Sequence, residues 1–377
     1  MRILYIYKSL YQKGGLERVI IEQMNLFRNR GNEIFIITTE QDNRPFPYKI
    51  DNLVHQIDLG IKSHHQSDFS FLKRIYKKLF NEFKIKAKLI DTIAEIKPDI
   101  IIGISIGLAD IIQDVRGNIP YIVQCHVPKE RTWCLKNGII GFDKLKFHIY
   151  LHKMKQCDAL VVLTNTDAEI WGNDYRTVVI PNIVHLNPNN TIVTGNEKKI
   201  IFVGRIHDDK GLPYLLDVWD IVHTKYPDWH LAIFGTGDEK DVSILQQKIS
   251  IREKISYEGV TNDIFKEYLS SSIHVLTSKR ESFGLVIAEA MSCGLPSVSF
   301  DSPYGPREII QNGVDGFLVP LGNVDEMANK ICYLIEHDEV RKHMGQKAIH
   351  NIQRFSADFI VPMWINLFNN LVNQQKG

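Results

Sequence analysis

Short apolar runs alternate with longer amphipathic segments along most of this 377-residue chain. In the first half, apolar runs occupy residues 3–7, 34–38, 100–104, 121–124, 160–163 and 178–180. These runs are rich in Ile and Val and are apolar at successive positions, which is typical of strands buried on both faces of a parallel sheet. A Gly14-Gly15 turn and a helical pattern over residues 19–27 follow the first run. Strands that alternate with helices predict a doubly wound α/β fold.

A polar stretch then interrupts the alternation. It begins at Pro181-Asn182 and continues to residue 199, and it is rich in the Pro, Asn and Gly residues that mark linkers. A second series of apolar runs follows at residues 200–203, 230–234, 255–258, 274–277 and 297–300. At roughly 100–200 residues per domain, the chain is expected to form two domains. Their expected bounds are residues 1–185 and 195–356.

The composition changes this picture little. The hydrophobic fraction is 44%, the charged fraction is 24% and the net charge is +1, so no nucleic acid partner is indicated. The five cysteines include no CxxC pair and are expected to be small buried residues of a reducing compartment. The N-terminal run meets Lys8 before it can form a signal peptide. We therefore expect a cytoplasmic protein, or one peripheral on the inner face of the cytoplasmic membrane.

Two carboxylates lie eight residues apart across an apolar run in the second half, at Glu281 and Glu289. The first is expected in a loop and the second inside a helix. The N-terminal amides of such a helix can bind anionic oxygens, and the carboxylates can accept hydrogen bonds from hydroxyl groups. A glutamate buried in an apolar helix needs a partner. For Glu289 that partner is either a ribose diol or a cation such as Arg307.

Basic residues follow the predicted strand at residues 200–203. Arg205 and Lys210 can neutralise a diphosphate, since arginine binds phosphate oxygens in a two-point fork and lysine adds a charge. The alternative is two solvated cations on a loop. The Gly235-Thr-Gly237 turn further on lacks the third glycine of a dinucleotide fingerprint, because position 240 is Lys.

In the first half, Gly14-Gly15 permits close approach of the backbone to a ligand, although an ordinary turn explains it equally well. His126 follows the predicted strand at residues 121–124, at the edge where open α/β sheets bind ligands. A lone histidine is more often structural, so this position also has two interpretations.

Several motifs together resemble one enzyme family. They are Val203-Gly204-Arg205 with Lys210-Gly211, Glu281-Ser-Phe-Gly284, Ala288-Glu289-Ala290, Cys293-Gly-Leu-Pro296 and Gly305-Pro-Arg-Glu308. They resemble the retaining glycosyltransferases of family 4, and the resemblance is strongest over residues 200–320. It implies the GT-B fold, in which two Rossmann-like domains face a cleft that holds the active site. It also implies that the last segment, residues 357–377, is a helix that crosses back to the N-terminal domain.

The resemblance assigns roles to individual residues. It implies that Glu281 binds the donor sugar, that Glu289 binds the ribose hydroxyls and that His126 faces the donor sugar. The catalytic set would be His126, Glu281, Arg205 and Lys210. The donor-binding set would be Gly14, Gly15, Arg205, Lys210, Gly235, Val260, Glu281, Phe283, Gly284, Leu285 and Glu289.

The resemblance also implies the reaction. A hexose or N-acetylhexosamine would pass from a nucleotide sugar, expected to be UDP-linked, to a growing surface glycan or a polyprenyl-linked oligosaccharide. The chain contains no Asp-x-Asp pair and no His/Cys cluster, so neither a metal nor another cofactor is expected. Two alternatives stay open, a nucleotide-sugar 2-epimerase of GT-B architecture and a non-catalytic nucleotide-sugar binding protein.

Residues 72–88 stand out by charge, with seven basic residues and one acidic residue. Apolar side chains recur there at helical spacing, at Leu72, Ile75, Tyr76, Leu79, Phe80 and Phe83. One interpretation is a helix that packs on the core and turns a solvated basic face outward. The other is contact with an anionic membrane surface.

Overall fold

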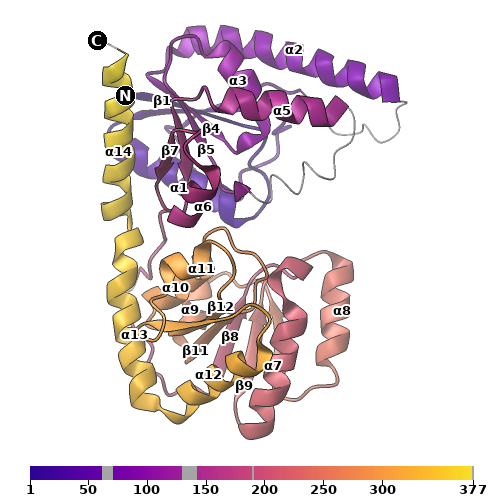
Figure 1. Ribbon diagram of the computed structural model, residues 1–377, viewed down its shortest axis with the longest axis vertical. Coiled ribbons are helices and arrows are strands. Elements are labelled where there is room, and N and C mark those ends of the chain that lie inside the picture. The colour runs from indigo at the N-terminus through magenta and orange to yellow at the C-terminus, as the bar shows by residue number, and fades with distance from the viewer. Residues whose placement is uncertain (62–70, 130–141, 189–190, 376–377) are drawn as a thin grey trace. The chain divides into compact units, whose positions relative to one another are not determined.

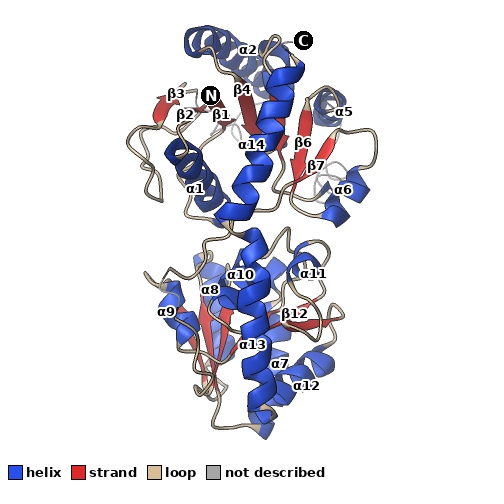
Figure 2. Cartoon of the chain, turned by 90° about the vertical axis from the view of Figure 1, so that its left-hand side faces the viewer, coloured by secondary structure: helices blue, strands red, loops and turns tan. Residues whose placement is uncertain are grey.

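The computed structural model describes residues 1–61, 71–129, 142–188 and 191–375. The chain forms two compact units (Figure 2). Unit 1 comprises Met1–Ile183 with Ile360–Gly377, and unit 2 comprises Val184–Phe359. The polar stretch that was expected to link the domains is mostly part of unit 2.

Unit 1 is built on a seven-stranded sheet in the order β3-β2-β1-β4-β5-β6-β7, and every pairing in it is parallel (Figure 1). Its strands are β1 (Arg2–Tyr7), β2 (Glu33–Thr38), β3 (His55–Asp58), β4 (Ile100–Ile104), β5 (Tyr121–Gln124), β6 (Ala159–Val162) and β7 (Thr177–Val179). The interior strands β4, β5 and β6 are buried along their whole length, which explains their uninterrupted apolar sequences.

Helices connect these strands. They are α1 (Gly15–Asn29), α2 (Phe71–Ile96), the 3₁₀ turn η1 (Ile106–Leu108), α3 (Ala109–Val115), α5 (Phe142–Met154) and α6 (Asn165–Trp171). The last helix, α14 (Ala357–Gln374), joins unit 1 from residue 360 onward. Its buried aromatic residues pack edge-on against Phe27 of α1, with ring centroids at 6.2 Å for Trp364 and 5.4 Å for Phe368. These contacts hold α14 against unit 1.

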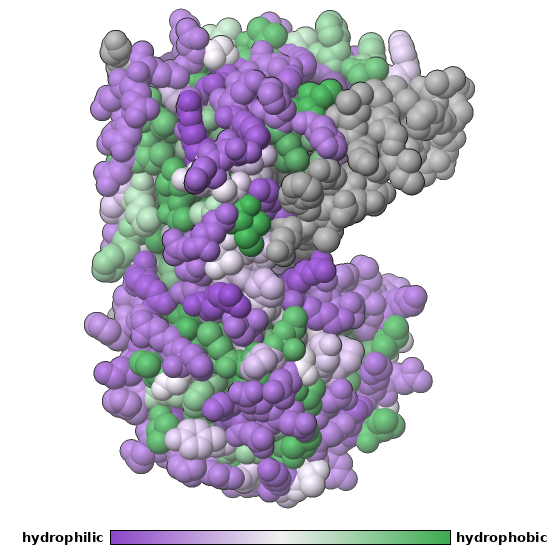
Figure 3. Space-filling view, viewed as in Figure 1, coloured by the Kyte–Doolittle hydropathy of each residue, from purple (hydrophilic) through white to green (hydrophobic). Residues whose placement is uncertain are grey.

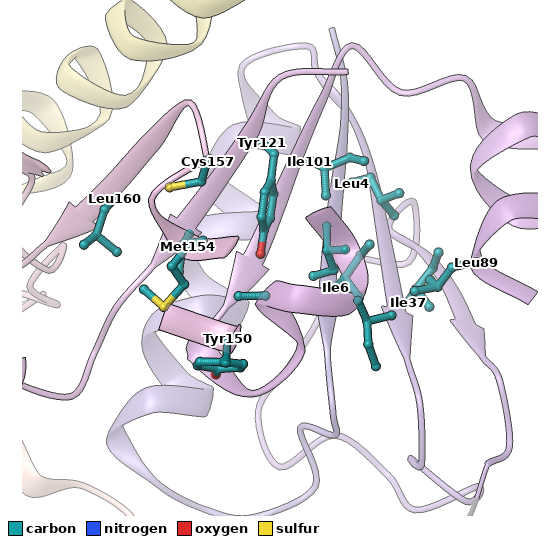
Figure 4. Packing of buried hydrophobic residues seen from close by; sticks show 14 of the residues in the cluster. Leu4, Ile6, Ile37, Leu89, Ile101, Tyr121, Tyr150, Met154, Cys157 and Leu160 are labelled. Atoms are coloured by element: carbon teal, nitrogen blue, oxygen red, sulfur yellow. The ribbon is translucent and has the colours of Figure 1, made fainter. Parts of the chain in front are cut away.

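The core of unit 1 lies between the sheet and the helices beside it (Figure 4). Leu4 and Ile6 of β1 and Ile101 of β4 face Leu89 of α2 across this layer. Tyr121 of β5 extends into the same cluster and is fully buried. Apolar residues from the strands thus meet the inward face of each helix, as the alternating sequence predicts.

Unit 2 is built on a six-stranded sheet in the order β10-β9-β8-β11-β12-β13, again parallel throughout. Its strands are β8 (Lys199–Val203), β9 (His230–Phe234), β10 (Ile255–Gly259), β11 (Ile273–Leu276), β12 (Ser297–Phe300) and β13 (Gly316–Val319). The helices are η2 (Asp208–Lys210), α7 (Leu212–Lys225), α8 (Glu239–Ile249), α9 (Ile264–Leu269), α10 (Leu285–Ser292), α11 (Gly305–Ile309), α12 (Val324–Glu336), α13 (Asp338–Ile352) and η3 (Gln353–Phe355).

Both sheets are doubly wound, which confirms the predicted fold class. In each unit the strand order reverses beside the first strand, between β1 and β4 in unit 1 and between β8 and β11 in unit 2. The sequence analysis missed β3 and β13, each of which lies at the edge of its sheet. Ligands of open α/β sheets bind at the carboxyl ends of the strands beside such a reversal. The two reversal points are therefore the places to look for a site.

The surface is largely polar. In the space-filling view, hydrophilic residues cover most of the visible face of each unit (Figure 3). Within the described residues, no helix combines the length and the apolar content that crossing a bilayer requires.

Candidate functional site

An ion pair occupies the reversal point of unit 2. Lys210 follows β8 and Glu281 follows β11, and these two strands are neighbours in the sheet. The Lys210 Nζ atom lies 2.5 Å from Oε2 of Glu281, and both side chains are about 15% exposed. The Ser278 hydroxyl donates a hydrogen bond to the same carboxylate oxygen at 3.1 Å. Hydrogen bonds to a charged group are among the stronger ones, so the Glu281 carboxylate is held in a fixed position.

Backbone contacts fasten the two loops together. The Thr277 hydroxyl donates to the carbonyl oxygen of Lys210 at 3.0 Å. Gly211 has a φ of +63°, and a Cβ at this position would collide with the carbonyl oxygen of Thr277. Only glycine combines this backbone angle with such a close approach. The Gly211 of the Lys-Gly motif therefore sets the distance between Lys210 and the strand that leads to Glu281.

A second ion pair links the same loops nearer to solvent. Lys279 Nζ lies 2.7 Å from Oδ1 of Asp208, and the Lys279 N–H donates to the carbonyl oxygen of Asp209 at 2.8 Å. The sequence analysis found no role for Asp208 and Asp209. The structure shows that they tie the loop after β8 to the loop after β11.

Arg205 is exposed and lies on a segment that runs along the end of β9. Gly204 donates its N–H to Phe234 at 3.0 Å, and Ile206 donates to Thr236 at 2.8 Å. Gly235 approaches this segment so closely that a Cβ would overlap the carbonyl oxygen of Gly204. These contacts on both sides of Arg205 fix its backbone and leave its side chain toward solvent.

Gly235 and Val260 lie at the same edge of the sheet. Gly235 follows β9 and donates its N–H to Gly259 of β10 at 2.7 Å, while the Tyr257 hydroxyl donates to the Gly235 carbonyl oxygen at 2.9 Å. Val260 directly follows β10 and its side chain is 57% exposed. An exposed apolar residue at this edge is available to a planar ligand.

The loop with Glu281 leads directly into α10. Gly284 caps the helix, whose first turn begins at Leu285, and Phe283 is buried. The first amides of a helix have no partner within it and can bind an anion. The Gly305 N–H donates to the carbonyl oxygen of Glu281 at 3.0 Å, which braces this loop against the start of α11.

Glu289 lies within α10 and is only 3% exposed. The structure therefore separates the two glutamates as expected, with Glu281 in the loop and Glu289 in the helix. Arg307, which was considered as a partner for Glu289, instead holds Asp301 in a two-point contact at 3.0 and 3.1 Å.

Sequence reasoning missed two residues of this region, Ser278 and Tyr304. Ser278 comes two residues after β11. Its place at the carboxyl end of a strand, where α/β sheets bind ligands, could have identified it from the sequence. Tyr304 pairs with Glu281 in a short backbone bridge and has a φ of +81°. A non-glycine residue in this region costs on the order of 1–3 kcal/mol, and such strain is frequent at functional sites. Nothing in the sequence around Tyr304 signals this conformation.

Unit 1 presents a different set of groups at its own strand ends. Gly14 caps α1 directly before Gly15, and a Cβ at Gly14 would lie 2.6 Å from Oε2 of Glu17. His126 follows β5 by two residues, and its Nε2 atom is buried without a hydrogen-bond partner in the part of the chain described. Burial lowers the pKa of His126 to about 4. The imidazole is therefore neutral at physiological pH.

Across the described ranges, no group of three or more His, Cys, Asp or Glu side chains is placed to hold a metal ion. The charged groups that the structure does bring together are the cation and the carboxylate of Lys210 and Glu281.

Two protein families match this chain. The family described as Glycosyltransferase Family 4 matches residues 13–187, and the one described as Glycosyl transferases group 1 matches residues 187–351. An uncharacterized glycosyltransferase of Haemophilus influenzae is 29% identical over 369 residues, which cover 96% of this chain and 98% of that protein. The amylovoran biosynthesis glycosyltransferase AmsD of Erwinia amylovora is 25% identical over 384 residues, with 98% and 99% coverage.

A solved structure shares the fold. The Staphylococcus aureus TarM mutant, in complex with fondaparinux, alpha-GlcNAc-glycerol and UDP, has a TM-score of 0.74 to this chain at 18% identity. The alignment covers 98% of this chain and 99% of that one. At this identity the similarity concerns the architecture.

Proposed function

We propose a sugar-transfer function for this chain, which belongs to the glycosyltransferases of group 1 and family 4 with the GT-B fold. The chain would transfer a hexose or N-acetylhexosamine from a UDP-sugar to a surface-glycan acceptor. We further propose that the transfer retains the anomeric configuration of the sugar. The acceptor would be a growing glycan, either free or attached to a polyprenyl carrier. The Lys210–Glu281 pair, at the reversal point of unit 2, is the observation that carries this proposal.

The difficult part of the reaction is the departure of the nucleotide diphosphate. Lys210 and Arg205 place two positive charges on the segment after β8, and Lys210 bonds Glu281 in the loop that leads into α10. Fixed cations and amides stabilise charge that develops in the transition state without having to reorganise. Phe283, Gly284 and Leu285 would offer amides to phosphate and sugar oxygens. Lys210 is already held by Glu281, so it would meet the diphosphate from a defined position.

Glu281 would accept hydrogen bonds from hydroxyl groups of the donor sugar. Its Oε2 atom is occupied by Lys210 and Ser278. A carboxylate has about four lone-pair sites, so two occupied directions leave others for a sugar. Glu289, buried in the apolar helix α10, would accept the two hydroxyls of the ribose. Gly235 and Val260 would lie beside the nucleoside.

The chemistry that follows is a single displacement on one face of the sugar. The bond between the anomeric carbon and the phosphate oxygen breaks, and a bond to the acceptor oxygen forms on the same face. The acceptor hydroxyl proton passes to the departing phosphate oxygen, so no residue of the chain needs to form a covalent intermediate. The neutral His126 ring and the Gly14-Gly15 turn of unit 1 would contact the sugar and the acceptor.

The proposed substrates are supported by the names of the similar proteins. AmsD is named for amylovoran biosynthesis, and the TarM structure contains UDP and a GlcNAc derivative. An epimerase function finds no support among these comparisons. The motif Ser302-Pro-Tyr-Gly-Pro-Arg-Glu308 also resembles members of the family that build capsule and exopolysaccharide.

Thermal unfolding in the presence of UDP-, GDP- and ADP-sugars would identify the donor, because a ligand that binds the native state raises the unfolding temperature. We expect a UDP-sugar to give the largest shift. Incubation of that donor with candidate glycans should then yield a lengthened acceptor and free UDP. An interconverted donor sugar with no lengthened acceptor would favour the epimerase, and protection without any turnover would contradict the proposed transfer.

A further inference from the structure

One helix of unit 1 turns apolar side chains toward solvent. On α2, the side chains of Tyr76 and Phe83 are each 71% exposed, and Leu79, Phe80 and Ile90 are between 44% and 52% exposed. We call these five residues the α2 stripe. The same helix buries a different set of residues in the core, namely Ile85, Leu89, Ile93 and Ile96. Figure 1 shows α2 at the margin of unit 1, where one face of the helix meets the sheet layer.

The α2 stripe is a continuous surface. At about 100° per residue, its members fall within one sector of the helix that is distinct from the buried sector. The rings of Tyr76 and Phe80 stack with centroids 6.1 Å apart. From residue 76 to residue 90 the stripe extends about 21 Å along the helix axis, at 1.5 Å per residue. The prediction that these apolar residues face the core is therefore wrong for Tyr76, Leu79, Phe80 and Phe83. The side chains of Leu72 and Ile75 lie outside the described residues.

Lysines flank the stripe, although Lys86 pairs with Asp114 and Lys88 donates to the carbonyl oxygen of Leu59. Residues 76–90 contain five lysines and one glutamate, although the whole chain has a net charge of only +1. Lys84 is exposed, and its Nζ atom lies 4.5 Å from the centre of the Phe80 ring. A helix with exposed aromatic residues between lysines has the composition of helices that lie in the interface of an anionic bilayer.

We propose that the α2 stripe docks this protein on an anionic lipid surface. Apolar rings enter the interface between headgroups and acyl chains, the Tyr76 hydroxyl stays among the headgroups, and the lysines bind anionic headgroups. An acidic protein is the alternative partner. The lipid surface fits better because the stripe is a convex ridge on a single helix, and a plane covers a ridge without a complementary groove.

The docking surface is separate from the residues proposed for transfer. All five stripe residues lie on α2, whereas the Lys210–Glu281 pair lies in unit 2. Binding to lipid is therefore testable without donor or acceptor, and its failure would leave the transferase proposal untouched. If both hold, the stripe brings the enzyme to the surface where polyprenyl-linked glycans reside.

Flotation with vesicles measures the docking directly. Vesicles of phosphatidylcholine with phosphatidylglycerol should carry the protein at low salt and release it at high salt, and vesicles of phosphatidylcholine alone should carry much less. The double variant Tyr76→Ser/Phe83→Ser should lose at least about tenfold in partitioning, because two large apolar side chains no longer leave water. Ile251→Ser is the matched control, since Ile251 is 83% exposed on unit 2.

Charge is tested in the same assay. Lys77→Gln/Lys84→Gln should weaken binding to the anionic vesicles by roughly fivefold for each lysine at low salt. Lys240→Gln/Lys248→Gln, on the exposed helix α8, should have no effect. Phe83→Trp should strengthen binding, because tryptophan favours the membrane interface. Stronger binding, unlike weaker binding, cannot be explained by a variant that fails to fold.

Two results would overturn the proposal. Wild-type protein that ignores anionic vesicles would exclude lipid and leave an acidic protein as the partner of the stripe. Equal flotation of wild type, the Tyr76/Phe83 variant and the Ile251 variant would show that binding occurs elsewhere on the molecule. Thermal unfolding of each variant controls for its fold.

Discussion

The residues proposed for the site differ between the carboxyl edges of the two sheets. In unit 2, the edge is charged and cross-linked, with Lys210 bound to Glu281 and Lys279 bound to Asp208. In unit 1, the residues proposed for the site are a glycine turn and the neutral imidazole of His126, while Lys8 and Glu40 form an ion pair that joins the ends of β1 and β2. The folds of the two units are alike, so the difference comes from the residues that follow the strands.

This difference matches two halves of a transfer reaction. A nucleotide diphosphate carries negative charge that must be held while it leaves, and the fixed cations of unit 2 suit it. An acceptor hydroxyl is neutral, and a neutral imidazole such as that of His126 can bind it by a hydrogen bond. We infer that charge handling belongs to unit 2. Four predictions test this division.

Loss of Lys210 should have the largest effect. Lys210→Ala removes the proposed contact with the leaving diphosphate and leaves the partly buried Glu281 carboxylate without its cation. Removal of one such stabilising group costs on the order of 100-fold or more in turnover. Steady-state kinetics with the donor identified by thermal shift would measure kcat and KM.

Lys279→Ala is the matched control for Lys210. Lys279 also bridges the loops after β8 and β11, but it pairs with the exposed Asp208. Surface ion pairs contribute roughly 0–1 kcal/mol, so this variant should stay close to wild type in both stability and turnover. If Lys210→Ala retained near-normal turnover, or if both variants lost activity equally, the assignment of Lys210 would fail.

The two glutamates should separate nucleotide binding from sugar binding. Glu289→Gln should weaken the binding of UDP and of the UDP-sugar alike, since the ribose is common to both. Glu281→Gln should weaken mainly the UDP-sugar. A hydrogen bond to a charged group contributes about 1.5–3 kcal/mol, which corresponds to a loss of roughly tenfold or more. Calorimetry with both ligands decides the matter, and the same loss for both ligands in both variants would remove the division of roles.

The interior strands of each sheet were predictable from sequence, whereas two of the four edge strands, β3 and β13, were not. Strands β4 and β5 are apolar at nearly every position. This pattern is typical of a strand whose two faces are both covered by helices. The edge strand β3 reads His55-Gln-Ile-Asp58 and is largely exposed, so its sequence resembles a loop. The four-residue strand β13 begins at a glycine. β3 buries little surface and therefore carries a weak apolar signal, whereas β13 is mostly buried but only four residues long.

Contacts between distant residues escaped prediction for a related reason. The sequence placed Lys210 and Glu281 after separate strands, but their pairing depends on β8 and β11 being neighbours, which the strand order decides. Likewise, the apolar periodicity of α2 did not reveal which face is buried. The structure buries the aliphatic residues Ile85 and Leu89 and exposes the aromatic Tyr76 and Phe83.

Two histidines with lowered pKa values, one in each unit, should make stability depend on pH. Burial lowers the pKa of His126 to about 4 and that of His274 to about 3, from an ordinary value of 6.5. Between about pH 6.5 and pH 4, the unfolded chain binds protons that the native chain does not, so stability falls as pH falls through this window. Well above pH 6.5, neither state is protonated and the full stability is present.

Replacement of either histidine should flatten this dependence. His126→Gln should reduce the difference in unfolding temperature between pH 5 and pH 7, measured by calorimetry, and His274→Gln should do the same. The His274 ring bonds Ser297 through Nδ1 at 2.9 Å inside the core, so its replacement should also destabilise the protein at neutral pH. An unchanged pH dependence in His126→Gln would show that this ring titrates normally, and the contrast between the neutral His126 of unit 1 and the charged Lys210–Glu281 pair of unit 2 would weaken.

A chelator should have the smallest effect of all. If Lys210, Arg205 and the first amides of α10 hold the diphosphate, the reaction has no need for a divalent cation to neutralise it. Turnover in EDTA should then stay within about twofold of the untreated enzyme, a difference of less than half a kcal/mol in the barrier. The informative control is the Lys210→Ala variant with added magnesium or manganese. A rescue of this variant by metal would show that a cation can replace the lysine charge, which supports the proposed role of Lys210. Complete loss of wild-type activity in EDTA, restored by either metal, would instead show that unit 2 does not manage the leaving group by its own charges.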